Sequence, residues 1–247
     1  MINLDFYTIF WREMLEIRKK LWRFIASGLV MPALYLITFG WGLGRGMRVG
    51  GGTYLEFVLP GIIALSAMNN SFSGVAVSLN ISKLYSKTIE ELLVSPISPY
   101  SIALGKVFAG CVRGLFSSML LLLLGLILNV QIHITAMFFA ILILTTFIFA
   151  SFGVIAAMVT KSHEDMTNFN SFFILPMSFL SGTFFSPSGL PEPFSSLIMV
   201  YPLTHASLSL RAISQGQPVS AVSLLILCLY ALAFFYLAVR AIKNLEI

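Results

Sequence analysis

Hydrophobic and polar positions alternate along this chain in long blocks. Six of the hydrophobic blocks carry almost no charge and, as helices, are long enough to cross roughly 30 Å of hydrocarbon. They cover residues 24–43, 57–82, 107–128, 134–160, 166–185 and 219–239. The composition agrees, because 58% of the residues are hydrophobic and 10% are charged. The pattern predicts an all-α integral membrane protein whose single transmembrane domain, residues 1–247, has six transmembrane helices.

Residues 1–23, which precede the first block, show a different pattern. Their hydrophobic positions recur at steps of four, four, three and four, at Phe6, Phe10, Met14, Ile17 and Leu21. The opposite face carries Asp5, Arg12, Glu16, Lys19, Lys20 and Arg23. This spacing is typical of an amphipathic helix that lies in the membrane surface. The segment lacks the short apolar core and cleavage site of a signal peptide, so we expect it to be retained.

A polar island, Ser82 to Lys106, separates the second and third blocks. Within it Thr88 and Glu91 have the spacing of a capping box, which predicts that a helix starts at Thr88. Pro96 disfavours the helical conformation of Ser95, so the helix should have about two turns. Its apolar edge consists of Ile89, Leu92, Leu93 and Pro96. Such a short helix is not stable alone, so it must dock on its own membrane domain or on a partner protein.

Proline and glycine mark three interruptions. Gly44 to Thr53 is a glycine-rich loop, and Pro60-Gly61 suggests a turn or a broken helix at the membrane boundary. Residues 187–218 contain two apolar pieces, Phe194 to Val200 and Ala206 to Ile213, each too short to span a membrane. Broken pieces of this kind enter a membrane only where protein shields their backbone, so we interpret 187–218 as a re-entrant helical hairpin.

The distribution of positive charge predicts the orientation. With both termini on one side of the membrane, that side holds eleven Lys and Arg residues and the other holds Arg45, Arg48 and Arg211. The positive-inside rule therefore places both termini and the Thr88 helix in the cytoplasm. Arg113 interrupts the third block. Its long side chain could extend to the headgroups, or it could face inward as a functional arginine.

The sequence lacks several kinds of chemistry. No phosphate-binding loop of the G-x-x-x-x-G-K-[ST] form occurs, so ATP hydrolysis, if it drives this protein, requires a separate subunit. His133, His163 and His205 fall in different predicted loops, which argues against a shared metal site. Cys111 and Cys228 lie in apolar blocks and are read as small hydrophobes. The predicted spans contain no carboxylate for a proton relay, and the net charge of +5 lies at segment ends rather than in a nucleic-acid groove.

Four passages, taken in order, resemble the membrane subunit of type 2 ABC exporters. They are Met31 to Gly44, Tyr54 to Gly74, Ile89 to Lys106, and Ser181 to Phe194 followed by Tyr201 to Arg211. Within that family the chain is most similar to the branch of the nodulation-factor and daunorubicin-resistance export permeases. It matches the polysaccharide-exporting branch less well around Met31 to Gly44.

The resemblance also implies which subunits make up the working exporter. Two permease chains would form a homodimer with two ATPase subunits, which bind ATP and magnesium, in the bacterial cytoplasmic (inner) membrane. Residues Phe6 to Trp22 would be the interface helix, and 187–218 the external re-entrant helices, with Pro187, Pro191 and Pro202 near the exit gate. The coupling helix would contact the ATPase through Thr88, Ile89, Glu90, Glu91, Leu92, Leu93, Ser95 and Pro96.

From these features we expect an exporter permease for an amphiphilic substrate such as a lipid, glycolipid, lipo-oligosaccharide or hydrophobic drug. The candidate pathway is Asn69, Asn70, Ser73, Asn168, Ser171, Phe172 and Ser178, where amides and hydroxyls lie among Phe and Met. The same small polar residues could instead hold helices together. Two other functions stay open. One is an integral-membrane enzyme for lipid-linked substrates that uses Glu56, Glu192, His133 and His205, and the other is a scaffolding subunit.

Overall fold

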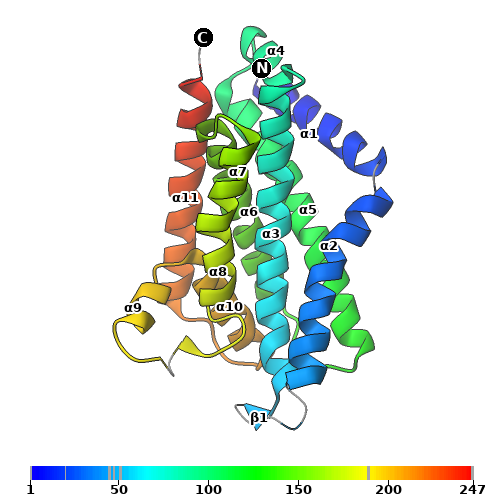
Figure 1. Ribbon diagram of the computed structural model, residues 1–247, viewed down its shortest axis with the longest axis vertical. Helices are drawn as coiled ribbons and strands as arrows, with labels where there is room; N and C mark the ends of the chain where they lie inside the picture. Colours follow the sequence, from blue (N-terminus) through cyan, green and yellow to red (C-terminus); the bar gives the residue numbers. More distant parts are fainter. Residues whose placement is uncertain are drawn as a thin grey trace.

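The computed structural model describes the chain except residues 1, 20, 44–45, 47, 50–51, 188–189 and 246–247. It is an elongated helical bundle with α3, Tyr54–Leu84, near its centre (Figure 1). Around α3 pack α5 (Pro99–Ile127), α6 (Ala136–Val159) and α10 (Pro202–Ser214), and α11 (Ala221–Lys243) packs on α6. Among the described helices, α3, α5, α6 and α11 are long and apolar enough to cross a membrane. The prediction of a mostly helical membrane protein is confirmed, and the total of six spans stays a prediction.

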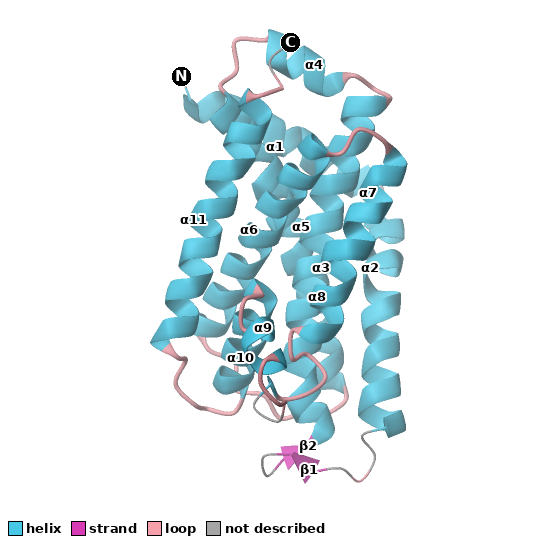
Figure 2. Ribbon diagram, turned by 60° about the vertical axis from the view of Figure 1, so that its left-hand side comes forward, coloured by secondary structure: helices cyan, strands magenta, loops and turns pink. Residues whose placement is uncertain are grey.

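The first and fifth predicted spans are each built from consecutive helical segments (Figure 2). Residues 24–43 fall on α2 (Leu21–Tyr35) and the π-helix η1 (Leu36–Leu43). Of the fifth predicted span, residues 166–180 fall on α7 (His163–Phe169), the π-helix η2 (Asn170–Ile174) and α8 (Leu175–Leu180), and residues 181–185 lie beyond the end of α8. Pro176 lies in the first turn of α8. Proline has no amide hydrogen to donate to the preceding turn. This missing donor is consistent with the wider π-helical turn of η2 directly before Pro176.

The start of α3 differs from the prediction. No turn or break occurs at Pro60-Gly61, because the helix continues through both residues. Thr53 caps it, since its hydroxyl accepts from the Glu56 amide and the Glu56 carboxylate accepts from the Thr53 amide. Residues 57–68 are all buried, so packing on every side compensates for the hydrogen bond that Pro60 cannot donate. The preceding loop holds a small antiparallel ribbon of β1 (Arg48–Val49) and β2 (Gly52–Thr53), an exception to the all-α prediction.

Glycine allows the closest helix contacts in the bundle. A Cβ atom at Gly153 of α6 would lie 2.7 Å from the carbonyl oxygen of Phe72 in α3. A Cβ atom at Gly110 or Gly114, one turn apart on α5, would instead meet a side-chain methyl group, that of Val75 in α3 or of Thr146 in α6. Small residues of this kind let membrane helices approach until their backbones touch. These contacts position α5 and α6 against α3.

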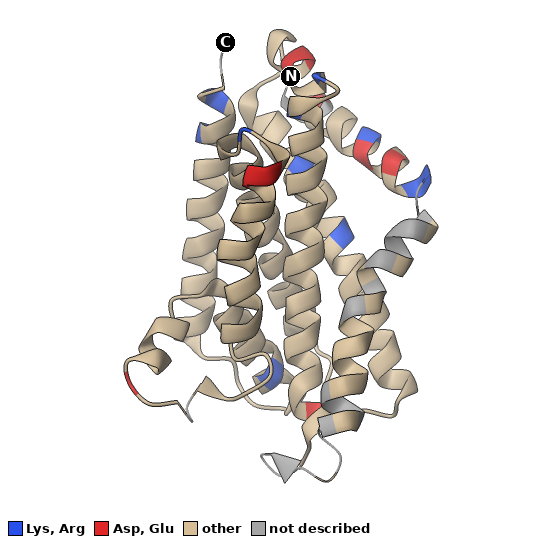
Figure 3. Cartoon of the chain, in the orientation of Figure 1, with Lys and Arg blue, Asp and Glu red and all other residues tan. Residues whose placement is uncertain are grey.

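Both chain termini and α4 (Thr88–Val94) lie at one end of the bundle, and the β ribbon, α9 (Phe194–Ile198) and α10 lie near the other (Figures 1 and 2). Charged side chains gather at the first end and on α1 (Ile2–Lys19), the amphipathic helix that packs on α5 (Figure 3). Within the predicted hairpin, the second helix begins at Pro202 rather than at Ala206, and it is buried among α3, α6 and α11.

Candidate functional site

The short helix α4 follows a sharp turn at the end of α3. Lys87 has a left-handed backbone with φ 51°, and its carbonyl accepts from the amides of Glu90 and Glu91. Lys87 is therefore the N-cap residue, and the predicted capping box of Thr88 and Glu91 is wrong. The Thr88 hydroxyl instead lies 3.1 Å from the Ser86 hydroxyl oxygen, so no side chain caps α4. The predicted end is confirmed, because the helix stops at Val94, before Ser95 and Pro96.

The two faces of α4 have different surroundings. Ile89 is 1% exposed, and Leu92 and Leu93 are partly buried against the bundle core. These three residues of the predicted apolar edge therefore dock on the protein's own membrane domain, whereas the fourth, Pro96, is exposed. Exposed residues of α4 and of the chain on either side of it form what we call the α4 outer face: Tyr85, Lys87, Glu91, Val94, Pro96 and Tyr100. Val94 is 80% exposed, so apolar surface is left at this end of the molecule.

The remaining predicted contact residues lie between these faces. Thr88 and Glu90 are half-buried. The half-buried Ser95 donates its hydroxyl hydrogen to the Leu92 carbonyl oxygen at 2.7 Å. Next, Ser98 starts α5, because its hydroxyl accepts from the Ser101 amide at 3.2 Å. A side-chain cap therefore fixes the residue at which α5 begins.

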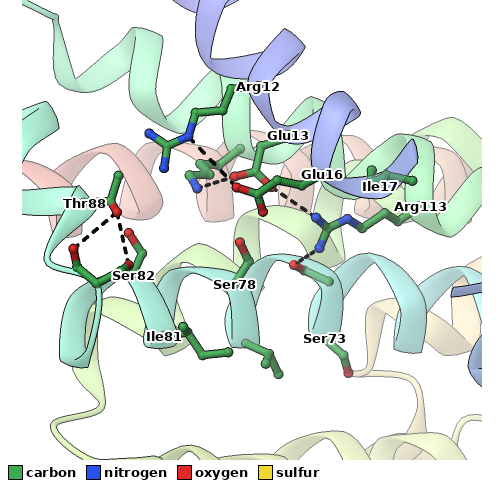
Figure 4. Close-up of a pocket in the computed structure, with 14 residues that line it drawn as sticks. Arg12, Glu13, Glu16, Ile17, Ser73, Ser78, Ile81, Ser82, Thr88 and Arg113 are labelled. Atoms are coloured by element: carbon green, nitrogen blue, oxygen red, sulfur yellow. Dashed lines mark hydrogen bonds and ion pairs between the residues drawn. The ribbon is translucent and has the colours of Figure 1, made fainter. Parts of the chain in front are cut away.

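A cavity of about 540 Å³ lies beside α4, between α1, α3 and α5 (Figure 4). Its charged lining residues come from α1 and α5, and they are Arg12, Glu13, Glu16, Lys106 and Arg113. Hydroxyl groups line the rest of it together with an apolar strip on α3. Ser73, one of the predicted pathway residues, is exposed and lines this cavity.

Glu13 forms a buried ion cluster with two cations of α5. Its Oε1 atom lies 2.5 Å from Nζ of Lys106, and its Oε2 atom lies 3.1 Å from Nη2 of Arg113. Arg113 also donates to the carbonyl oxygen of Gly74 in α3. Burial raises the pKa of the Glu13 carboxyl, but Lys106, Arg113 and Arg12 together lower it more, so the pKa lies below the ordinary value. The cluster joins α1, α3 and α5.

The hydrophobic pattern does not predict this cluster, although the spacing of its residues along α1 and α5 contains a signal for it. Glu13 lies three residues after Phe10 and four before Ile17, on the apolar face of α1. Lys106 and Arg113 are seven residues apart, two turns along one face of α5. Of the two interpretations of Arg113, the inward-facing one agrees with the structure. The carboxylate comes from α1, which is why a search of the predicted spans did not find it.

On α3, Asn70 holds helices together. Its amide nitrogen lies 2.9 Å from the hydroxyl oxygen of Ser117 in α5, and it also donates to the carbonyl oxygen of Ser66. Ser117 in turn donates to the carbonyl oxygen of Gly28 in α2. This network agrees with the alternative that Asn70 holds helices together, and its pathway role stays a prediction. Asn69, its neighbour, is half-buried.

The other predicted pathway residues lie on the α7–η2–α8 segment. Asn168, Ser171 and Phe172 are exposed, and Phe172 is 74% exposed. Ser178 is buried, and its hydroxyl donates to the Ile174 carbonyl oxygen at 2.7 Å. Asn168 and Ser171 therefore lie on the outside of a single chain, whereas Ser178 lies inside it. The physical reason is that the π-helix η2 changes the angular register between them and Ser178.

At the opposite end, the three predicted gate prolines are separated. Pro187 and Pro202 are buried, and Pro202 begins α10, whereas Pro191 is exposed. The charge distribution predicts Arg211 on the outer side as a topology charge, but its side chain is buried. It donates to the carbonyl oxygens of Phe57, Gly182 and Thr183, and it covers the Phe57 ring at 3.7 Å. Arg211 therefore ties α10 to α3.

Of the four residues considered for an enzyme site, Glu56 and His133 line one cavity, and neither Glu192 nor His205 lines it. His205 belongs to α10, not to a loop, and its ring contacts Met199 and Ser223. Glu192 accepts from Ser196, and Glu56 accepts from the Thr53 amide. Among the residues that the structure describes, no group of three or more His, Cys, Asp or Glu side chains could hold a metal ion.

Comparison with known proteins gives matches over nearly the whole chain. The family model of the ABC-2 type transporter matches residues 5–214. The inner membrane transport permease YadH of Escherichia coli K12 is 29% identical over 200 residues, which cover 79% of this chain and 77% of the relative. Nodulation protein J of Rhizobium meliloti is 27% identical over 246 residues, which cover 97% and 93%. Nodulation protein J of Sinorhizobium fredii is 28% identical over 225 residues, which cover 89% and 86%.

Proposed function

The chain belongs to the ABC-2 type transporter family, as the membrane subunit of an ABC transporter, and from that premise we propose that it exports an amphiphilic molecule. A separate ATPase subunit supplies the energy by hydrolysing ATP with magnesium. The chain lies in a bacterial inner membrane with both termini in the cytoplasm. The concentration of Lys and Arg at the end that holds the termini supports this orientation (Figure 3).

The α4 outer face carries the proposal. Its acidic and apolar side chains, Glu91 and Val94, project from the end of the bundle while Ile89 anchors the helix from behind. A short helix anchored in this way passes a movement of its bound partner on to α3 and α5 and stays folded. We therefore assign α4 as the coupling helix that contacts the ATPase subunit.

Homodimer formation is supported by the α7–η2–α8 segment. It leaves Phe172, Phe173, Leu175 and Phe179 exposed in a single chain, with the amide of Asn168 and the hydroxyl of Ser171 beside them. Aromatic rings with a few polar groups form a surface that suits the wall of a pathway between two copies. Such a wall accepts a molecule with both apolar and polar parts. Two permease chains and two ATPase subunits would complete the exporter.

A cross-linking experiment tests the coupling role. The exposed Cys228 and the buried Cys111 are first replaced by serine and alanine, and a single cysteine is placed at Glu91. Cross-linking to a co-expressed ATPase subunit through this position, and not through a cysteine at Gln217 at the opposite end, is the expected result. A stable permease that purifies with no ATPase and no second copy would instead favour a scaffolding subunit.

A further inference from the structure

The cavity between α1, α3 and α5 carries excess positive charge. Three cations, Arg12, Lys106 and Arg113, and two carboxylates, Glu13 and Glu16, line it. In the described part of the chain, Glu13 is the one carboxylate within ion-pair distance of Lys106 and Arg113, so two buried cations share a single negative charge. The Nε atom of Arg113 is also buried without a hydrogen-bond partner. Buried charge of one sign is costly unless an opposite charge compensates it.

One wall of the same cavity is apolar and continues onto the outside of α3. Val77 and Ile81 line the cavity, and they are 39% and 45% exposed. Ser78 and Ser82 contribute hydroxyl groups beside them. A cavity that combines cations, hydroxyls and an apolar strip has the chemistry of a lipid site, because a soluble anion would leave the apolar strip uncovered.

The position of the cavity points to the headgroup layer. It lies beneath the amphipathic helix α1, whose charged face includes Arg12 and Glu16 (Figure 4). Arg113 lies seven residues, about 10 Å, further along α5 than Lys106. The cations are thus spread from the surface helix toward the hydrocarbon. A lipid phosphate in the headgroup layer lies within this range of depth.

We propose that this cavity binds the phosphate group of an anionic glycerophospholipid, with an acyl chain along Val77 and Ile81. Arg113 and Arg12 provide the positive charge, and Glu13 holds Lys106 and Arg113 in place. Its volume of about 540 Å³ lies within the range of sites for small molecules. Lipid binding at this site does not require the ATPase contact. The lipid-site proposal can therefore be tested separately from the coupling role of α4.

The test uses the purified full-length chain in a neutral detergent. Phosphatidylglycerol, zwitterionic phosphatidylcholine and soluble glycerol phosphate are titrated separately, and the melting temperature and the lipid retained in native mass spectrometry are recorded. We expect phosphatidylglycerol to raise the melting temperature and to remain bound, phosphatidylcholine to act more weakly, and glycerol phosphate to have no effect at the same concentration. An equal effect of glycerol phosphate would overturn the lipid assignment in favour of a soluble anion.

Three variants and a control test whether the residues that line the cavity bind the lipid. Arg12→Gln should lower the affinity for phosphatidylglycerol by about threefold to tenfold, and Ser78→Phe should abolish retention by filling the cavity. Arg18→Gln, an exposed position on the same helix outside the lining, should change nothing. Glu13→Gln should gain more thermal stability from phosphatidylglycerol than the wild type does, because the lipid phosphate replaces the lost carboxylate. Unchanged binding in Arg12→Gln and Ser78→Phe, or equal gains with both lipids, would overturn the proposal.

Discussion

The Nζ atom of Lys106 lies 2.5 Å from Oε1 of Glu13, although 93 residues separate them in the chain. Both side chains are almost fully buried. Because Arg113 contacts the second oxygen of the same carboxylate, the surface helix α1 is fastened to α5 by charge as well as by packing. The contact with Arg113 also involves α3, through the Gly74 carbonyl oxygen. If α1 moves during transport, α5 must therefore move with it, or the cluster must break.

Replacing Glu13 by glutamine should destabilise the protein. It leaves Lys106 and Arg113 buried without a carboxylate, and breaking one side of a buried ion pair typically costs about 3–5 kcal/mol. The measurement is the melting temperature in detergent by fluorescence-detected size exclusion. Glu16→Gln is the matched control, because its pair with Arg12 is 4.0 Å long and half-exposed, and it should shift the melting temperature little. Equal shifts in the two variants would contradict the prediction.

The same carboxylate predicts a pH dependence. Burial raises the pKa of Glu13, but Lys106 and Arg113 lower it more, so its folded-state pKa is below 4.5. A depressed carboxyl pKa contributes stability that is present above the unfolded-state pKa and is lost as the pH falls through the folded-state pKa. The stability difference between wild type and Glu13→Gln should be constant from neutral pH to about 5 and should shrink below 4.5. A difference that grows on acidification would refute this assignment.

Reversing the charge of the α4 outer face should uncouple transport. Glu91 is exposed while the helix is anchored through Ile89, so Glu91→Arg should leave folding and dimerisation intact and abolish export, measured in membrane vesicles with the ATPase co-expressed. Glu164→Arg is the matched control, because Glu164 is also exposed and lies in the first turn of α7, which starts at the same end of the bundle. Full export by a stably inserted Glu91→Arg protein would remove α4 from the mechanism.

Helix packing at Gly153 should tolerate no side chain. An added Cβ would lie 2.7 Å from the Phe72 carbonyl oxygen, and backbone cannot move aside as a side chain can. Gly153→Ala should therefore cost about 1–3 kcal/mol, seen as a lower melting temperature in detergent. Ile143→Ala, at an exposed position of the same helix, should have a smaller effect. A neutral Gly153→Ala variant would show that α3 and α6 are further apart than described.

The sequence by itself determined the class of the protein and the existence of its long helices. An apolar run as long as 134–160 far exceeds a membrane β-strand and therefore satisfies its backbone groups in a membrane as a helix, so the pattern needed no tertiary information. Pro96 likewise determined the end of α4, because its steric effect acts on the preceding residue. The capping box failed because the left-handed turn at Lys87, which the pattern did not predict, moved the N-cap by one residue.

The tertiary structure decided which polar groups meet. Glu13 finds Lys106 and Arg113 only after α1 packs on α5, and Asn70 finds Ser117 only after α3 packs on α5. The π-helix η2 decided that Asn168 and Ser171 face outward while Ser178 is buried. Local rules describe neighbours within a few residues, whereas these contacts are selected by the burial of whole helix faces across the bundle.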